Sequence, residues 1–488
     1  MSSLYPRQFA GVLIPLGLVL LLLSGCNRGP TPLVDVETLA VVGSQEISDS
    51  WFERTYVDFL IRTGQNDTES NRRAHLENLI DAVLLAEEAE RAGLTADSAF
   101  QVFRDRERKK ALGTVFFHEE LLLELPPPTD AEVRLAFARW KAQVVVRHLF
   151  FQSEEDALAS YNRLRAGKDF LQEAQEWYGV PGDSSAGYLG PVKYFEMDDA
   201  FAEAAFNLEE GAFSRPVQSR FGWHIIRSER ILVNPLLTED EYQVRRGGIE
   251  SQFRLRRRKL EGDAFVRDFM AGLDVEANGP AIAGLAGLID DLTIEVAPEI
   301  EIQGAEEVAR AAVLDSLKAM ISAETVLATY RLGGRQREFT AGDYLLWMED
   351  LPFEVTRRRT VNSVGRALRN EVFAQEAERK GLEDEIAEGL VWEASTLRLA
   401  GMMRNKLREN PGTVSDSMLA VAAERAGWFA RAVRMADADT VGMRRALAPI
   451  VAEYRLIDSL RASTTIEVDT LRYQQLQEGL NAVPDLGR

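Results

Sequence analysis

Two of the chain's four histidines, His148 and His224, each lie in a short apolar segment whose composition predicts a β-strand. An imidazole can donate or accept a hydrogen bond, and it is also a common metal ligand. A zinc site needs three or four ligands, and no third His, Cys or carboxylate stands at ligand spacing beside either histidine. Two interpretations remain open. The histidines are either ordinary residues of the core or a polar pair within a functional site.

Helix and turn signals between the two segments predict how the histidines are positioned. Residues 154–165 predict a helix that ends at Gly167, a second helix starts after Lys168, and a third begins at Met197. Glycine and serine residues between these helices predict tight loops. The order is strand, helices, short strand, helix and two strands. It predicts a small α+β domain with a four-stranded, mostly antiparallel sheet.

Six short motifs follow one another along this stretch. They are Arg147-His148-Leu149, Gly167-Lys168-Asp169-Phe170, Gly187-Tyr188-Leu189-Gly190, Met197 with Phe201, the turn from Gly211 to Val217, and the strand from Phe221 to Ile226. In this order they resemble the parvulin family of peptidyl-prolyl cis/trans isomerases. One such motif is weak evidence, whereas six in register are specific.

The resemblance implies a site for a proline-containing peptide. The proline ring is expected to lie in an apolar pocket formed by four side chains: Leu189, Met197, Phe201 and Phe221. His148 and His224 match the family's paired histidines beneath that pocket, and Ser219 falls where the family often has a hydroxyl. Rotation of a planar amide needs no metal, cofactor or nucleophile, because binding the twisted amide better than the planar one lowers the barrier. In isolation, Met197 and Phe201 at i and i+4 also fit a core-facing helix stripe.

One position departs from the family pattern. The family's usual cysteine or aspartate beside the rotating carbonyl is Val180 here, and valine can neither donate, accept nor carry charge. Asp183 is the nearest carboxylate in the same loop. We therefore expect proline binding, with isomerase activity weakened by Val180. The acidic residues Glu154, Glu155 and Asp156 argue against phosphate-directed specificity, which needs arginine or lysine there.

The first 25 residues predict a secretion signal, because a basic start is followed by an uncharged apolar run from Phe9 to Leu23. Leu-Ser-Gly before Cys26, the only cysteine, resembles a bacterial lipoprotein signal, with an ordinary signal or start anchor as the alternative. Lipidation of Cys26 predicts an extracytoplasmic, membrane-anchored protein. Asn27 favours the periplasmic face of the outer membrane. With no other thiol, the chain cannot form an internal disulfide.

Composition excludes one class of partner. Lys and Arg total 57 against 77 Asp and Glu, which gives a net charge of −20 and argues against nucleic acid. Residues 254–259 form a basic cluster within this otherwise acidic chain. It predicts either a solvated helix face or contact with anionic lipid headgroups.

The flanking regions predict helical modules. Ala40 to Ser48 reads as a hairpin whose last residue, or Asp49, caps the next helix, and residues 76–91 are amphipathic. This layout resembles the N-terminal chaperone region of the SurA and PrsA foldases. Thr129 with Glu132 predicts a capping box for the helix that leads into the first parvulin strand.

A similar pattern returns at a constant offset of 288 residues. Residues 373–382 repeat residues 85–94, and Gly333 to Thr340 parallels the first hairpin. The predicted organisation is then as follows: a signal at 1–25, a tether at 26–38, a helical module at 39–140, a parvulin domain at 141–235, a helical connector at 236–285, and a second helical module at 286–488.

Together these features predict a lipid-anchored, extracytoplasmic foldase. Its expected partners are unfolded exported polypeptides with X-Pro bonds and, through the anchor, a membrane. One alternative is a module that binds chains without useful catalysis. Another is a scaffold within an envelope assembly, which predicts a stoichiometric folded partner.

Overall fold

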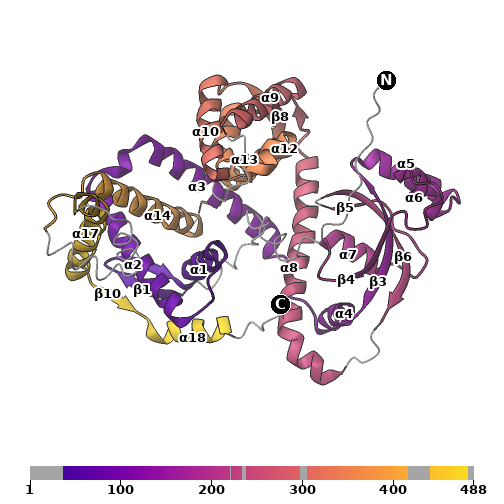
Figure 1. Ribbon diagram of the computed structural model, residues 1–488, viewed down its shortest axis with the longest axis horizontal. Helices are drawn as coiled ribbons and strands as arrows, with labels where there is room; N and C mark the ends of the chain where they lie inside the picture. The colour runs from indigo at the N-terminus through magenta and orange to yellow at the C-terminus, as the bar shows by residue number, and fades with distance from the viewer. Residues whose placement is uncertain are drawn as a thin grey trace. The chain divides into compact units, whose positions relative to one another are not determined.

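The computed structural model describes residues 37–219, 221–233, 238–296, 305–383, 385–415 and 440–481. The chain divides into two compact units (Figure 1). Unit 1 comprises residues 1–120 and 269–482, and unit 2 comprises residues 121–268 and 483–488. Over the described ranges, no helix has both the length and the apolar character needed to cross a bilayer. The predicted signal sequence and Cys26 lie outside the described residues.

Unit 2 is built on a four-stranded antiparallel sheet in the order β4-β3-β6-β5. Its strands are β3 (Gln143–Phe151), β4 (Tyr188–Lys193), β5 (Val217–Ser219) and β6 (Gly222–Leu232). The helices between them are α5 (Glu154–Arg165), α6 (Phe170–Tyr178) and α7 (Asp199–Phe206). This architecture confirms the predicted α+β domain.

Alternation along β3 and β6 divides the side chains between the two faces of the sheet. On one face Leu149, Phe151 and Ile225 form a core with residues of α5 and α6. On the other face Val146 and Ile226 pack against α7. The two histidines stand in register with this second set, so α7 covers the face that carries them.

Two further helices of unit 2 flank the sheet. Helix α4 (Asp130–Trp140) starts with the predicted capping box, in which the Thr129 side chain and the Glu132 carboxylate cap each other's backbone N–H groups. Helix α8 (Glu239–Ala271) carries the basic cluster. Its Arg256 is 3% exposed and pairs with Asp199 at 2.9 Å. The prediction of a solvated helix face is therefore wrong for Arg256, because this side chain is buried against the start of α7.

Unit 1 contains two runs of elements in the same order. The first run is β1 (Thr38–Val42), β2 (Gln45–Ser48), α1 (Asp49–Thr63), α2 (Glu69–Arg91), the 3-10 turn η2 (Leu94–Ala96) and α3 (Ser98–Phe117), followed by the π-helical turn η3 (His118–Leu122). The second run is β8 (Val326–Leu332), β9 (Arg335–Thr340), α11 (Ala341–Met348), α12 (Phe353–Arg358), α13 (Thr360–Lys380) and α14 (Glu385–Glu409). A hairpin, a capped helix and two long helices thus occur in both.

The two runs exchange elements. Each hairpin gains a third strand from outside its own run: β10 (Ile466–Val468) lies beside β1, and β7 (Glu276–Ala277) lies beside β8. Helix α3 packs on α13 of the second run, and α14 packs on α2 of the first. The remaining helices are α9 (Gly279–Val296), α10 (Ala305–Met320), α17 (Thr440–Ser463) and α18 (Thr470–Asn481).

This exchange divides the chain differently from the sequence-based domain boundaries. The predicted modules at 39–140 and 286–488 fall largely into one compact unit, while α4 and most of the predicted connector lie in unit 2. The reason is long-range packing. The aromatic rings of Phe116 on α3 and Phe373 on α13 lie 5.1 Å apart, and Lys109 pairs with Glu371 at 2.7 Å.

Candidate functional site

Strand register brings the two histidines together. His148 on β3 lies opposite Ile226, and His224 on β6 lies opposite Phe150, so the two imidazoles are diagonal neighbours on one face. Their Nδ1 atoms are 3.3 Å apart and the ring planes differ by 15°. A hydrogen bond between two Nδ1 atoms needs one donor and one acceptor. Two neutral rings in this contact therefore hold opposite tautomers.

Ser219 extends this pair. Its partner in the β5–β6 register is Gly222, so its hydroxyl faces His224, and Oγ lies 2.7 Å from Nε2. The same oxygen accepts the backbone N–H of Phe221 at 3.1 Å. Ser219, His224 and His148 thus form a continuous hydrogen-bonded chain.

Phe201 lies against both imidazoles. Its ring centroid is 5.8 Å from that of His148 and 5.3 Å from that of His224, with interplanar angles of 79° and 90°. The Asp198 side chain places this residue, because it caps α7 by accepting the backbone N–H groups of Ala200 and Phe201. Edge-to-face contacts of this kind hold the rings in fixed orientations.

Burial keeps the histidine pair neutral. Desolvation by burial, together with the neighbouring His148, lowers the pKa of His224 to about 4. Desolvation also lowers the pKa of His148. At pH 7 both rings are uncharged, so they can act through hydrogen bonds rather than as cations.

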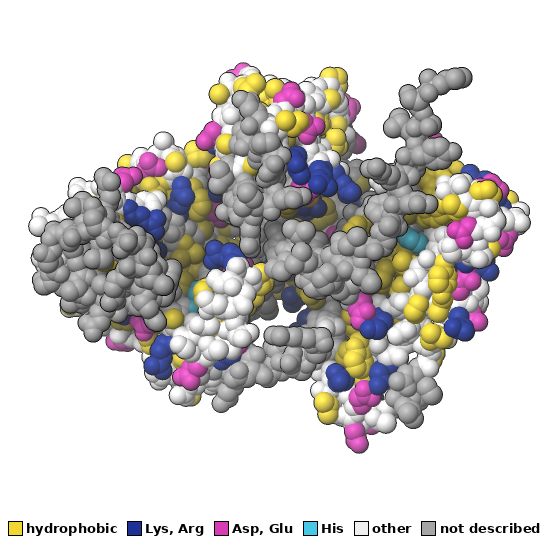
Figure 2. Space-filling view, in the orientation of Figure 1, with side chains coloured by type: hydrophobic (Ala, Val, Ile, Leu, Met, Phe, Trp, Pro, Cys, Tyr) yellow, Lys and Arg dark blue, Asp and Glu magenta, His cyan; other side chains and the backbone are white. Residues whose placement is uncertain are grey.

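The predicted pocket residues differ in exposure. Phe201 is 2% exposed, Met197 is half-buried against the α7 core, and the side chains of Leu189 and Phe221 are 44% and 52% exposed. Leu189 lies where the β3–β4 register shifts at a bulge. Figure 2 shows a histidine of unit 2 at the surface beside hydrophobic side chains. The site therefore has a buried aromatic base and an exposed apolar rim.

Val180 lies in the loop between α6 and β4, and its side chain is 36% exposed. Its backbone N–H bonds to the carbonyl of Gln175 at 2.9 Å. The carboxylate of Asp183 accepts the N–H and the hydroxyl of Ser185, at 2.8 and 2.7 Å. Asp183 therefore stabilises its own turn, and the structure engages it there rather than at the histidine pair.

Arg147 and Gly187 belong to the parvulin-like motifs, but the sequence alone indicates no role for either residue. Arg147 is buried, and its guanidinium donates to the carbonyls of Ser184 and Ala186 in the loop that carries Asp183. Gly187 has φ +70°, and a Cβ there would lie 2.4 Å from the His148 carbonyl oxygen. Both residues hold the α6–β4 loop against β3, directly beside His148.

Two aromatic residues at the end of α6 were also missed. Strand β4 pairs with β3 only as far as Arg147, which leaves the next backbone groups of β3 without a strand partner on that side. The Tyr178 hydroxyl accepts the Phe150 N–H at 3.0 Å, and the Trp177 indole N–H donates to the Phe150 carbonyl at 2.9 Å. The sequence feature that could have indicated this role is the pair of aromatic residues directly before Gly179, the glycine that ends α6.

Metal ligation has no candidate set in the part of the chain that the structure describes, since no three His, Cys, Asp or Glu residues there are grouped to hold an ion.

Residues 151–230 match the family model described as Rotamase, the PPIC-type PPIASE domain. The chain is 31% identical over 195 residues to the foldase protein PrsA of Halalkalibacterium halodurans, covering 39% of this chain and 56% of that protein. It is 30% identical over 175 residues to the PrsA of Caldanaerobacter subterraneus, covering 33% and 57%. A solved SurA-like chaperone of Campylobacter jejuni is 24% identical, with 49% of this chain and 99% of that chain covered and a TM-score of 0.19. The chain thus spans just over half the length of the curated relatives.

Proposed function

We propose that this protein, which carries a parvulin-type domain resembling those of the SurA and PrsA foldases, is an extracytoplasmic peptidyl-prolyl cis/trans isomerase and folding chaperone. The observation that carries the proposal is the hydrogen-bonded chain Ser219–His224–His148 under Phe201, inside the residues that match the PPIC-type model. The substrates are X-Pro bonds of unfolded polypeptides.

The arrangement suits amide rotation because no covalent step is required. Leu189, Met197 and Phe221 supply apolar surface for the proline ring, and Phe201 supplies the aromatic base. The neutral histidine pair orients Phe201 and offers a polar but uncharged wall. Excluding water from the carbonyl weakens its resonance with nitrogen, and a site that fits the twisted amide lowers the barrier of about 18–20 kcal/mol.

Unit 1 supplies the chaperone part of the proposal. The relatives are named foldases, and the second run of elements adds a second set of helices to this unit. Uncatalysed prolyl isomerisation takes roughly 10–100 s at 25 °C. Holding a client while one slow bond rotates therefore limits its aggregation.

Attachment to a membrane through lipidated Cys26, on the periplasmic face of the outer membrane, is part of this proposal. Its support is sequence alone: the apolar run from Phe9 to Leu23 followed by Leu-Ser-Gly-Cys. Incorporation of labelled palmitate by the full chain, and its absence in Cys26→Ala, tests this part.

The central test is isomerase activity of the chain from Asn27 onward on unphosphorylated X-Pro peptides. The His148→Ala, His224→Ala double variant should lose about tenfold or more in rate, because it removes two hydrogen bonds and the support of Phe201. Ser219→Ala should lose less, since only one hydroxyl goes. Unchanged rates in the folded double variant, checked by circular dichroism, contradict the proposed site.

A second candidate function follows from Val180, which leaves the loop position without a polar group. In that case the domain binds proline segments and holds them without useful catalysis. Val180→Asp separates the two. A large gain in rate from a nearly inactive parent favours the binding role for the natural chain, whereas an active parent with little change favours the enzyme.

A further inference from the structure

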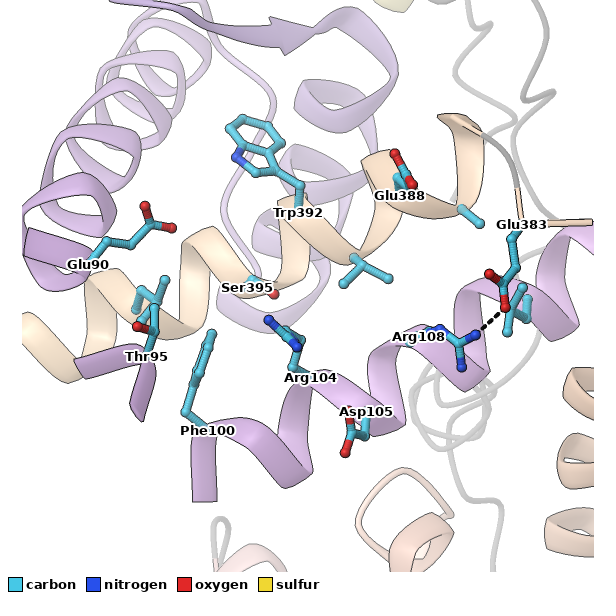
Figure 3. Close-up of a pocket in the computed structure, with 14 residues that line it drawn as sticks. Glu90, Thr95, Phe100, Arg104, Asp105, Arg108, Glu383, Glu388, Trp392 and Ser395 are labelled. Atoms are coloured by element: carbon cyan, nitrogen blue, oxygen red, sulfur yellow. Dashed lines mark hydrogen bonds and ion pairs between the residues drawn. The ribbon is translucent and has the colours of Figure 1, made fainter. Parts of the chain in front are cut away.

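Unit 1 contains a pocket of about 480 Å³ between helices α2, α3 and α14 (Figure 3). Its walls are mainly apolar, and they come from both runs of elements. The apolar lining residues are Phe100, Leu112, Ala387, Val391, Trp392 and Leu399. The volume lies within the range of ligand pockets in proteins, roughly 300–1,000 Å³.

The pocket is built at matching positions of the two runs. At the offset of 288 residues that relates residues 85–94 to 373–382, Phe100 corresponds to Glu388 and Arg104 corresponds to Trp392. All four of these residues line the pocket. Equivalent positions of the two runs thus form both walls, and they carry different side chains.

The apolar floor is held by the core of unit 1. Phe100, Leu112 and Leu399 are each no more than 2% exposed, and Phe100 and Leu399 belong to one core cluster with residues of α2. Trp392 rests edge-on against buried Trp51, at a centroid distance of 5.2 Å. A ligand side chain would therefore enter a pocket that exists before binding, which reduces the entropy lost on association.

The rim is acidic. Among the described residues, the carboxylates of Glu90, Asp105 and Glu388 have no hydrogen-bond or ion-pair partner. Arg108 is already paired with Glu378 and Glu383. Arg104 is then the one rim cation without an ion-pair partner within the described ranges, and three carboxylates outweigh it. The rim therefore favours a positively charged ligand.

We propose that this pocket binds an extended polypeptide segment in which a large apolar side chain is flanked by Lys or Arg. The apolar side chain enters between Phe100 and Trp392, and the flanking cations lie at Glu90, Asp105 and Glu388. The guanidinium of Arg104 donates to a peptide carbonyl. The proposal rests on the proposed function for its ligand class, unfolded polypeptide, but it uses a site in the other unit.

The probe is a fluorescent ten-residue peptide with one phenylalanine between lysines and no proline. Its binding to the chain from Asn27 onward is followed by anisotropy at two salt concentrations. Glu90→Gln with Glu388→Gln should weaken binding about tenfold at low salt and flatten its salt dependence. The control removes two other exposed glutamates of α14, Glu385→Gln with Glu409→Gln, and should leave binding unchanged.

A second pair of variants tests the apolar floor. Val391→Trp places an indole in the pocket and should abolish binding, whereas Leu397→Trp adds the same group to an exposed position of α14 outside the pocket. Circular dichroism confirms that each variant is folded. Binding that is absent in the parent, equal in all variants, or equal for a peptide with glutamates in place of the lysines overturns the proposal.

Isomerase activity is measured on the same proteins with an X-Pro peptide. The His148→Ala, His224→Ala variant should keep binding of the proline-free peptide, and Val391→Trp should keep isomerase activity. Failure of the pocket is thus distinguishable from failure of the isomerase assignment.

Discussion

The candidate sites of the two units are assembled in different ways. In unit 2, His148, Phe201, Ser219 and His224 all fall within one run of fewer than a hundred residues and lie on one sheet face. In unit 1, the pocket joins residues 90–112 to residues 383–399. The first includes two of the four histidines of the chain within recognisable local motifs, whereas no local motif marks the second. Local motifs are visible in a sequence, but a composite pocket forms only through packing.

The two sites also treat charge differently. The histidines of unit 2 are neutral because burial opposes their protonation. The pocket of unit 1 keeps its carboxylates at an exposed rim, where water solvates them. We infer that unit 2 selects by shape and unit 1 by charge as well as by apolar contact.

The largest expected effect is a loss of stability in one unit when a buried phenylalanine of its hydrophobic core is replaced by alanine. Phe116 on α3 is 1% exposed, and Phe170 on α6 is 3% exposed. Either residue changed to alanine should destabilise its own unit by about 3–5 kcal/mol. Phe116→Ala should lower the unfolding temperature of unit 1 while isomerase activity persists, and Phe170→Ala should do the reverse.

Thermal melts followed by circular dichroism, with residual isomerase activity at each temperature, check this pair. If both variants lower both signals equally, the units unfold as one cooperative body and the comparison fails.

A smaller effect is expected from acid. The folded-state pKa of His224 is about 4, below its ordinary value near 6.5, so the unfolded chain binds a proton first as pH falls. Stability from this group is complete above pH 6.5 and is lost as pH falls toward 4, by about 3 kcal/mol in all. Burial likewise lowers the pKa of His75, in unit 1, to about 4.

Urea unfolding at several pH values measures this loss. His224→Gln should weaken the pH dependence of the free energy of unfolding of unit 2 alone. His75→Gln should weaken that of unit 1 alone. An unchanged profile in His224→Gln means that its imidazole is not the group that titrates.

The smallest effect concerns two glycines of one loop. Gly187 and Gly182 both have positive φ, so the left-handed backbone conformation alone should cost about 1–2 kcal/mol for alanine at either position. Only at Gly187 does the added Cβ meet the His148 carbonyl oxygen, whereas nothing lies within 4 Å of it at Gly182. Gly187→Ala should therefore also reduce isomerase activity several-fold. Thermal melts of both variants measure the loss of stability that the positive φ causes at each position. Equal activity in the two variants argues against a role of this contact in placing His148.

Much of the local structure was predictable. The helix at residues 154–165 and the capping box at Thr129 have the predicted bounds. Hairpins also form at the two predicted places, although their first strands begin earlier than predicted, at Thr38 and at Val326. Caps, glycines and apolar periodicity act within a few residues, so the sequence expresses them directly. The order of the parvulin motifs likewise led to the correct sheet.

Other features were not predictable because they depend on contacts between distant residues. The pairing of β10 with β1 joins strands more than four hundred residues apart. The burial of Arg256 depends on Tyr194 and Asp199, which no pattern within α8 announces. Trp177 and Tyr178 bond to the backbone of β3 only because β4 stops pairing with β3 at Arg147.

The sequence by itself determined the elements of this protein, the presence of a parvulin-type domain and the residues that could form its site. It did so because backbone preferences, caps and alternation are local, and because histidine is rare here. Only the tertiary structure decided that helices of the two helical regions pack across one another to form one unit, and that a pocket forms between them. Those outcomes depend on which apolar surfaces bury one another, and that choice is made by the whole chain at once.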